Sequence, residues 1–214
     1  GLGDVYKRQI LTGVGRAFCV GRDIKEQADL AGDVETYTSS FLGANRPALT
    51  VLTPGDKPLI SAVNGFALGL GMFLMCAGDI RIASEGAEVG VPELPTGVLG
   101  PWYLTLSELL PRAVSAELIL MGERISGERA VEIGLINRVV PADQLEATAR
   151  AYALRLAAFP QEHLRATLHL MRRAHVKPSE ELMLEMDDVI RDLYRRADTA
   201  EVAAAFLAKQ RTIV

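Results

Sequence analysis

Apolar residues cluster most densely between Lys57 and Glu93, and the polar residues among them predict the elements of this stretch. Residues 59–63 are a short, mostly apolar run, which is typical of a buried strand. The pair Asn64-Gly65 predicts a turn, because both residues tolerate a positive φ. Residues 72–77 predict a buried helix, and residues 80–83 predict a second strand. Such an order directs the free backbone N–H groups at the helix start toward one point.

The run from residue 59 to residue 77 is almost long enough to cross a bilayer. Its clearly polar side chains are Ser61 and Asn64. Three glycines and the Asn-Gly turn interrupt it, which favours a broken element buried in a folded core. We therefore expect no membrane partner.

Weaker patterns on either side complete a core of strands and helices. Strands are expected at residues 9–11 and 136–140, a loop at 13–21 and a turn at 85–90. Short helices are expected at residues 102–110 and 115–121. A further helix begins with Ser126 as its N-cap and ends at Gly134.

Helical periodicity dominates after Pro141. Asp143 and Glu146 have the spacing of a capping box, and further helices are expected after Pro160, from Ser179 and from Asp198. Apolar side chains line one face of the first two: Leu145, Ala149, Tyr152 and Leu156, then Leu164, Leu168 and Met171. We divide the chain into a core, residues 1–141, and a helical section, residues 142–214, whose apolar stripes serve core packing and subunit contact.

Composition and charge exclude several classes of protein. Hydrophobic residues make up 49% of the 214 residues and charged residues 23%, as in an ordinary globular protein. A formal net charge of −4 leaves no basic stripe, so we expect no nucleic-acid partner. The two cysteines, Cys19 and Cys76, lie in apolar stretches and suit buried free thiols in a reducing compartment. We expect a cytoplasmic protein.

Several familiar site motifs are missing from the sequence. A GxGxxG dinucleotide loop fails because Leu74 and Phe18 stand where the third glycine is needed, and no GxxxxGK[ST] loop occurs. The sequence contains no CxxC, HExxH or EF-hand pattern, and its three histidines are six residues apart, so we expect no metal. No GxSxG elbow occurs either, which disfavours an α/β-hydrolase.

The remaining candidate chemistry is a pair of features, the donors near Gly69-Leu70-Gly71 and the carboxylate of Glu93. Backbone N–H donors without phosphate-loop spacing are more suited to bind a polarised carbonyl oxygen, as in an oxyanion hole. Glu93 follows Pro92 in an apolar stretch, where a carboxyl group holds its proton more tightly and can act as an acid or base near neutral pH. A structural carboxylate that caps a loop is the alternative role for Glu93.

Three segments resemble the signatures of the crotonase (enoyl-CoA hydratase/isomerase) superfamily, in unbroken order over roughly residues 10–211. They are residues 11–26 (LTGVGRAFCVGRDIKE), residues 62–69 (AVNGFALG) and the pair Pro92-Glu93. The resemblance implies an α/β fold with a ββα spiral core and a helical C-terminal section. It also implies homotrimers or homohexamers, and coenzyme A as part of the substrate, with no separate cofactor.

The resemblance assigns roles to residues of this chain one by one. The backbone amides of Arg22 and Leu70 match the two oxyanion donors, and Glu93 matches a catalytic acid/base. Asp23 and Lys25 fall in the segment that borders the nucleotide of coenzyme A. Phe206 and Lys209 match C-terminal positions that touch a neighbouring subunit's coenzyme A, although helix packing and solvation explain both residues equally well.

This sequence departs from the family pattern in two places. A second family glutamate, which in hydratases helps to hold the attacking water, falls on Phe73. The family's opening strand hairpin and helix have no counterpart before residue 10, and residues 4–9 look like a translated sequencing adapter. We therefore expect a fragment of a longer protein; an ordinary basic segment is the alternative.

Together these features predict an acyl-CoA enzyme that stabilises a thioester enolate and uses one glutamate as acid/base. Phe73 favours double-bond isomerisation over hydration, since isomerisation needs one carboxylate. A hydratase with a substitute second acid/base and a non-catalytic acyl-CoA binder remain as alternatives.

Overall fold

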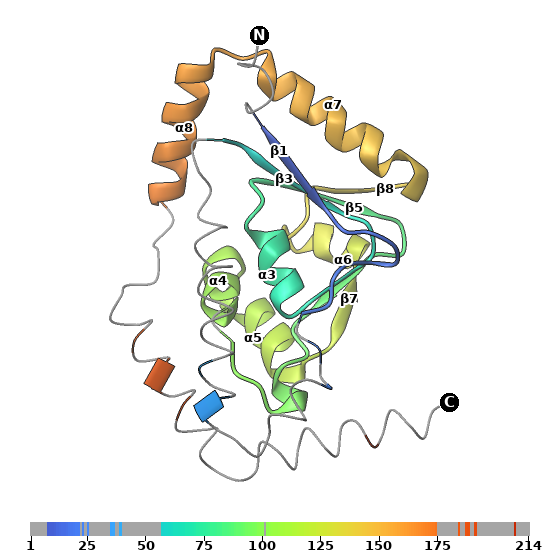
Figure 1. Ribbon diagram of the computed structural model, residues 1–214, viewed down its shortest axis with the longest axis vertical. Helices are drawn as coiled ribbons and strands as arrows, with labels where there is room; N and C mark the ends of the chain where they lie inside the picture. The colour runs from blue at the N-terminus through green and yellow to red at the C-terminus, as the bar shows by residue number, and fades with distance from the viewer. Residues whose placement is uncertain are drawn as a thin grey trace.

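The computed structural model describes residues 8–21, 57–100 and 102–174, together with residues 23, 25, 35, 36, 39, 184, 187, 188, 191 and 208. In this part of the chain the strands form two four-stranded sheets (Figure 1). The first, sheet A, is parallel and has the order β1 (Gln9–Thr12), β3 (Leu59–Val63), β5 (Ile80–Ser84), β8 (Arg138–Val140). The second, sheet B, has the order β2 (Ala17–Cys19), β4 (Phe66–Leu68), β6 (Glu88–Gly90), β7 (Arg124–Ser126), with β7 antiparallel.

The chain passes repeatedly from sheet A to sheet B. Strands β1 and β2, β3 and β4, and β5 and β6 follow one another in sequence, and each pair places one strand in each sheet. Helix α3 (Leu70–Cys76) follows the second pair directly. The later helices are α4 (Trp102–Leu109), α5 (Arg112–Met121), α6 (Gly127–Glu132), α7 (Leu145–Ala157) and α8 (Gln161–Ala174). This is the ββα spiral that the sequence resemblance implies.

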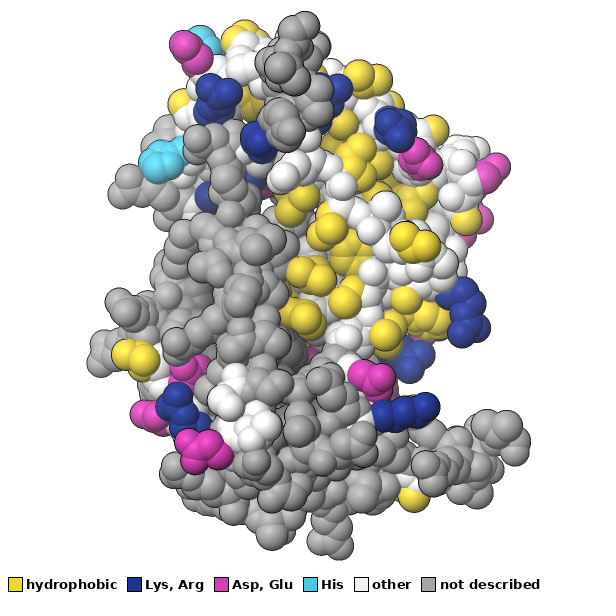
Figure 2. Space-filling view, in the orientation of Figure 1, with side chains coloured by type: hydrophobic (Ala, Val, Ile, Leu, Met, Phe, Trp, Pro, Cys, Tyr) yellow, Lys and Arg dark blue, Asp and Glu magenta, His cyan; other side chains and the backbone are white. Residues whose placement is uncertain are grey.

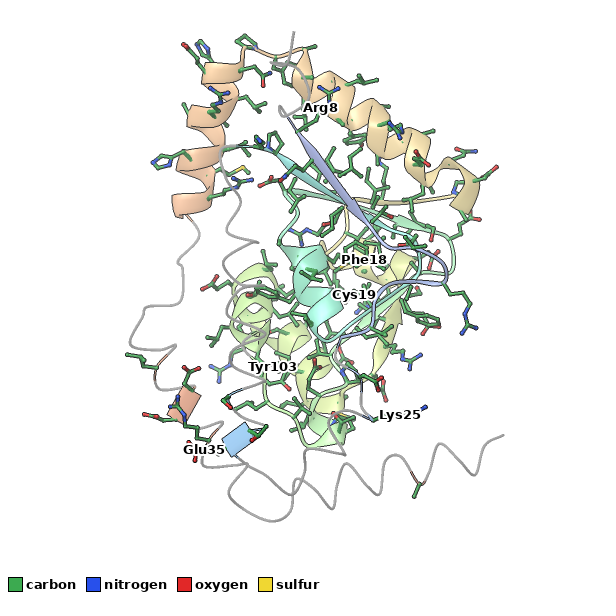
Figure 3. The ribbon with its side chains drawn as sticks, in the orientation of Figure 1. Arg8, Phe18, Cys19, Lys25, Glu35 and Tyr103 are labelled. Atoms are coloured by element: carbon green, nitrogen blue, oxygen red, sulfur yellow. The ribbon has the colours of Figure 1, made fainter. Side chains whose placement is uncertain are left out.

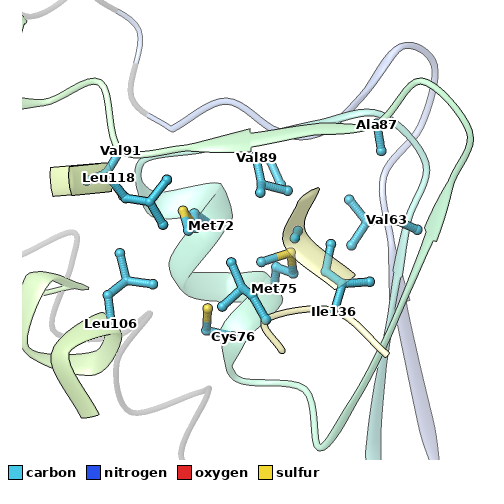
Figure 4. Close-up of a cluster of buried hydrophobic side chains, with 14 of the residues drawn as sticks. Val63, Met72, Met75, Cys76, Ala87, Val89, Val91, Leu106, Leu118 and Ile136 are labelled. Carbon is cyan, nitrogen blue, oxygen red and sulfur yellow. The ribbon is translucent and has the colours of Figure 1, made fainter. Parts of the chain in front are cut away.

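Strand β3 is buried on both faces, and its side chains alternate between two clusters. Val63 belongs to the main cluster around α3, where Met72 and Met75 pack against Val89 and Leu118 (Figure 4). Ile60 and Ala62 face the other way, against α7. Because both faces of β3 are covered, its sequence reads as a continuous apolar run.

Helix α7 covers the outer face of sheet A (Figure 1). Leu145, Ala149 and Ala153 are buried against Ile60 and Ile82, and Tyr152 and Leu156 pack at the edge of the same cluster. The apolar face expected for this helix is therefore confirmed. The first helix of the C-terminal section thus takes part in the core of the spiral.

Helix α8 is joined to the sheet by a partly buried ion pair. Arg172 donates to both carboxylate oxygens of Asp79 at 3.0 and 2.7 Å, and also to the Lys57 carbonyl at 2.9 Å. Asp79 in turn accepts from the Leu59 amide at 2.8 Å, at the start of β3. One carboxylate thus joins α8 to the strand that leads into the 64–71 segment.

Some predicted elements are wrong. The loop expected at 13–21 contains β2, and the turn expected at 85–90 contains β6. The turn expected at Asn64-Gly65 is instead a bend in which neither residue has a positive φ, and β4 follows it. These strands have three residues each, too few to show a period of two, and their pairing in sheet B creates them.

Smaller corrections concern single residues. Asp143 lies inside a 3-10 helix, η2 (Ala142–Gln144), and the α7 N-cap is Gln144 without a side-chain cap bond, so the predicted capping box is absent. Cys76 is buried as expected, but Cys19 is only partly buried. Met171 is exposed, whereas Leu168 is buried. Ser126 does cap α6, since its hydroxyl accepts from the Arg129 amide at 3.2 Å.

The surface combines hydrophobic and charged areas. Hydrophobic side chains gather over the strands on the face shown in Figure 2. Ile10, Val14 and Val20 are exposed hydrophobic residues of the β1–β2 region. Within the described residues, no helix has both the length and the apolar character needed to cross a bilayer.

Candidate active site

Glu93 directly precedes a short 3-10 helix, η1 (Leu94–Thr96), and the residue is buried, with 7% of its surface exposed. Its backbone carbonyl accepts hydrogen bonds from the amides of Thr96 and Val98, at 3.0 and 2.9 Å. The hydroxyl of Thr96 donates to the same carbonyl at 2.8 Å. These bonds fix the backbone of Glu93, so the direction of its carboxylate is set by the turn that follows.

The carboxylate of Glu93 points at Gly69, the residue that precedes α3. Gly69 has φ 57° and ψ −118°, a conformation that L side chains rarely adopt. A β-carbon at this position would collide with Glu93 Oε1 and lie 3.2 Å from its Cδ. Gly69 donates its own amide to the Gly90 carbonyl of β6 at 3.0 Å. Glycine is therefore required here for its backbone conformation and for the space that Glu93 occupies.

Leu70 follows Gly69 and is the first residue of α3. Amides in the first turn of a helix have no intrahelical acceptor, so the Leu70 N–H can serve a ligand. Gly21, after β2, lies beside it, because a β-carbon built on Gly21 would be 3.6 Å from Leu70 N. Arg22, the other predicted donor, lies outside the described residues. The structure thus brings together Glu93, Leu70 and the residue that precedes Arg22.

Strand β2 lies directly against α3. The α-carbon of Gly71 faces the backbone of Cys19 so closely that a β-carbon would collide with the Cys19 carbonyl. Figure 3 shows Phe18 and Cys19 beside the first turn of this helix. The position of β2 therefore determines where the chain at Gly21 meets Leu70.

Phe73 is one helical turn beyond Gly69, to whose carbonyl its amide donates at 3.1 Å. Its side chain is partly buried and packs against the main hydrophobic cluster. The helix position that carries the second glutamate in family hydratases thus presents an aromatic, non-ionisable group.

Tyr103 is a site residue that sequence reasoning missed (Figure 3). It lies on α4, and its hydroxyl donates to the Val98 carbonyl at 3.2 Å, at the end of the turn that holds Glu93. Burial and, second, the negative charge of Glu93 raise the pKa of Tyr103, so its phenol stays protonated. A tyrosine ten residues after a glutamate is no known signal, since the contact depends on how α4 folds back.

Two of the four residues predicted to border coenzyme A are among the described residues. Asp23 and Lys25 are exposed, and Asp23 Oδ1 accepts from the Lys25 amide at 2.8 Å. Phe206 and Lys209 lie outside the described residues. Among the side chains that are described, no group of three His, Cys, Asp or Glu residues could hold a metal ion, and the expectation of no metal stays a prediction.

Comparison with known proteins decides the family. The sequence model of the enoyl-CoA hydratase/isomerase family matches residues 4–212. A Mycobacterium bovis protein described as "Probable enoyl-CoA hydratase echA8" is 34% identical over 205 residues, which are 94% of this chain and 77% of the relative. The chain belongs to the enoyl-CoA hydratase/isomerase family. It is accordingly an enzyme of the crotonase superfamily, as the three sequence motifs indicate.

Two further proteins with carnitinyl-CoA in their names are similar to this chain. The carnitinyl-CoA dehydratase of Salmonella typhi is 35% identical over 176 residues, which are 80% of this chain and 66% of the relative. The crystal structure of a carnitinyl-CoA hydratase from Mycobacterium avium matches with a TM-score of 0.79 and 30% identity, over 95% of this chain and 78% of that one. This likeness confirms the predicted α/β fold.

Proposed function

We propose that the chain is an acyl-CoA double-bond isomerase in which Glu93 is the one acid/base. The observation that carries this proposal is the contact of the Glu93 carboxylate with Gly69, next to the Leu70 amide, while Phe73 occupies the other family glutamate position. The base, Glu93, thus contacts the residue that directly precedes the oxyanion donor, Leu70. Together they match what proton removal next to a thioester carbonyl needs.

The reaction begins with a 3-enoyl-CoA whose thioester oxygen accepts from the Leu70 amide and from the backbone after Gly21. Glu93 removes a proton from C2, and the C2–H electron pair moves into a C1–C2 double bond as the thioester oxygen gains negative charge. The two amides stabilise that charge, a type of interaction worth about 10²–10³-fold in rate for each donor. The dienolate then takes the same proton from Glu93 at C4, which leaves a 2-enoyl-CoA and an ionised Glu93.

The apolar side chain of Phe73 supports isomerisation over hydration. Phe73 cannot orient a water molecule or deliver a proton, and an apolar wall keeps water away from the dienolate. Tyr103 is a titratable side chain whose pKa is raised by burial and, second, by the negative charge of Glu93. Because its pKa is raised and its proton is donated to the Val98 carbonyl, it is poorly suited to replace the second glutamate.

Hydration of a 2-enoyl-CoA is the second candidate, and the names of the relatives favour it. Both the Mycobacterium bovis relative and the Mycobacterium avium structure are described as hydratases. A hydratase reaction here would need a second acid/base in place of Phe73. A non-catalytic acyl-CoA binder would bind these thioesters without forming a product.

The experiment supplies a 3-enoyl-CoA and, separately, a 2-enoyl-CoA to the protein in ¹⁸O-labelled water. An isomerase moves the double bond without adding oxygen, whereas a hydratase incorporates ¹⁸O into a 3-hydroxyacyl product. Rapid ¹⁸O incorporation with no isomer formed would overturn the proposal in favour of a hydratase. Binding without any product would favour the non-catalytic binder.

The same proposal includes the surroundings of the site. Asp23 and Lys25 border the nucleotide of coenzyme A, and Phe206 and Lys209 reach the coenzyme A of a neighbouring subunit. We propose with it a homotrimer or homohexamer that acts in the cytoplasm, in fatty acid metabolism. Support comes from the family resemblance; measuring the mass of the assembly tests the trimer.

A further inference from the structure

Asn64 makes the most extensive side-chain hydrogen-bond network near the site among the described residues. It lies in the short connection between β3 and β4, and its amide group reaches the loop between β1 and β2. Its Oδ1 accepts from the Gly13 amide at 2.9 Å and from the Thr12 hydroxyl at 3.5 Å. Its Nδ2 donates to the carbonyls of Gly15 at 2.9 Å and Ala17 at 3.2 Å. Reversing the amide would set its oxygen against two carbonyls, so the network itself fixes the orientation.

This network lies where two neighbouring segments cross from sheet A to sheet B. In sheet A the last β1–β3 pair is Thr12 with Ala62, and in sheet B the first β2–β4 pair is Ala17 with Phe66. Between these pairs the ladder is interrupted, and the Asn64 side chain bonds three backbone groups of the crossing loop. Gly65 lies so close to the Arg16 carbonyl that a β-carbon there would collide with it. The Asn64 bonds therefore hold the β1–β2 loop while β2 enters sheet B.

The position of β2 determines the geometry of the proposed oxyanion hole. Ala17, whose carbonyl Asn64 holds, is only four residues before Gly21 in the chain. In between, β2 packs its Cys19 backbone on Gly71 of α3. Gly21 then lies beside the Leu70 amide. A shift of β2 relative to α3 would therefore move one donor segment relative to the other.

We propose that Asn64 is a positioning residue, which holds the β1–β2 loop and β2 so that the backbone after Gly21 and the Leu70 amide bind one thioester oxygen together. This inference rests on the proposed function, because it concerns the oxyanion hole described there. Asn64 acts through the backbone and does not touch the substrate. It therefore affects the polarisation of the thioester carbonyl and the rate of enolate formation, and the affinity for coenzyme A much less.

The test compares two variants of the full chain with wild type. Asn64→Ala removes all of these bonds, and Asn64→Asp replaces the donating nitrogen with an oxygen of the same size. The probe is butyryl-CoA labelled with ¹³C at the thioester carbonyl, and two quantities are measured: the ¹³C chemical shift of the bound carbonyl, and the rate at which its C2 protons exchange with D₂O. Wild type should shift the carbonyl resonance from its free value and catalyse exchange.

In both Asn64 variants the bound carbonyl resonance should return toward its free value. The exchange rate at saturation should fall at least about tenfold, since small misplacements of catalytic groups have effects of this size. The concentration of butyryl-CoA at half saturation should change less than about twofold. A role in stability alone would leave the carbonyl shift of the folded protein unchanged.

Gln161 supplies the matched control. Its Nε2 donates to the carbonyls of Leu156, Ala157 and Phe159 at 3.4, 3.2 and 2.7 Å, between α7 and α8. Gln161→Ala and Gln161→Glu make the same chemical changes in an amide network remote from Leu70, and should lower stability while leaving the carbonyl shift and exchange rate unchanged.

Different outcomes separate the positioning role from the proposed function. A wild-type protein that binds butyryl-CoA without shifting its carbonyl resonance would overturn the oxyanion hole, and with it this inference. A wild-type shift that the folded Asn64 variants retain, with normal exchange, would overturn the role of Asn64 alone. Failure of both Asn64 variants to fold, while the Gln161 variants fold, would also overturn it, because Asn64 would then be required for the fold as a whole.

Discussion

The carboxylate of Glu93 occupies the space that a β-carbon of residue 69 would need. This contact joins the turn after β6 to the start of α3, two segments that lie more than twenty residues apart in sequence. It places an acid/base group beside the Leu70 amide. A substitution at residue 69 therefore tests whether this arrangement is needed for activity.

Gly69→Ala should abolish most of the activity. The added methyl group displaces the Glu93 carboxylate, and alanine must adopt the strained combination of φ 57° and ψ −118°, which costs about 1–3 kcal/mol. We expect turnover of an enoyl-CoA to fall about 10²-fold, since the acid/base is misplaced. Gly134→Ala is the matched control, because Gly134 also has a positive φ, of 77°, but open space around its α-carbon. It should lose stability and keep its turnover number; an equal loss in both variants would contradict the account.

Leu70→Pro removes the proposed oxyanion donor without removing a carboxylate. Leu70 is the first residue of α3, a position where proline is well tolerated. Turnover should fall by about 10²–10³-fold, the effect of losing one such donor. Leu70→Ala keeps the backbone N–H and should retain turnover within about tenfold. Circular dichroism checks the fold of both variants, and a folded Leu70→Pro protein with normal turnover would exclude the Leu70 amide as a donor.

Phe73→Glu should introduce hydration. The substitution places a second carboxylate at the helix position of the other family glutamate, where it can orient water. General acid–base catalysis contributes about 10²–10⁴-fold, so we expect ¹⁸O incorporation from water into a 3-hydroxyacyl product to rise at least tenfold above wild type. Phe73→Gln has nearly the same shape as Phe73→Glu and cannot ionise, so it should show no rise. Unchanged incorporation in a folded Phe73→Glu protein would indicate that Phe73 does not determine the reaction.

Stability should depend on pH through Cys76. Burial raises the pKa of this thiol from 9.0 to about 11, and nearby Arg81 acts in the opposite direction. Between these two values the folded protein keeps a proton that the unfolded chain releases, so the free energy of unfolding falls as pH rises from 9 to about 11. Below pH 9 the thiol contributes no slope. Urea unfolding should show a steeper loss for wild type than for Cys76→Ala over this range, and equal slopes would contradict the prediction.

The sequence predicts the elements in which burial imposes a regular pattern of apolar residues. Leu59–Val63 is recognisable because both faces of β3 are buried, and α7 because one face packs on sheet A. Strands β2, β4 and β6 are not recognisable, since their three residues become strands only through pairing in sheet B.

Site geometry is predictable only in part. Motif resemblance identifies Glu93 and the glycine turn, but their contact depends on the hydrogen bond from Gly69 to Gly90, which joins β4 to β6. Tyr103 has no signal in the sequence, because α4 must fold back for its hydroxyl to reach Val98. The hydrogen bonds of Asn64 are likewise not predictable, because the pair Asn64-Gly65 indicates only a turn.

The central claim is that Glu93 removes a proton from the carbon next to a thioester carbonyl. Exchange of the C2 protons of butyryl-CoA and longer saturated acyl-CoA thioesters with D₂O, followed by mass spectrometry, tests it most directly, because a saturated chain can be neither hydrated nor isomerised. Wild type should add deuterium at C2, and Glu93→Gln, with the same fold and affinity for the thioester, should add none above the rate without protein. Exchange by Glu93→Gln at the wild-type rate, or its absence from a wild-type protein that converts enoyl-CoA, would contradict the account.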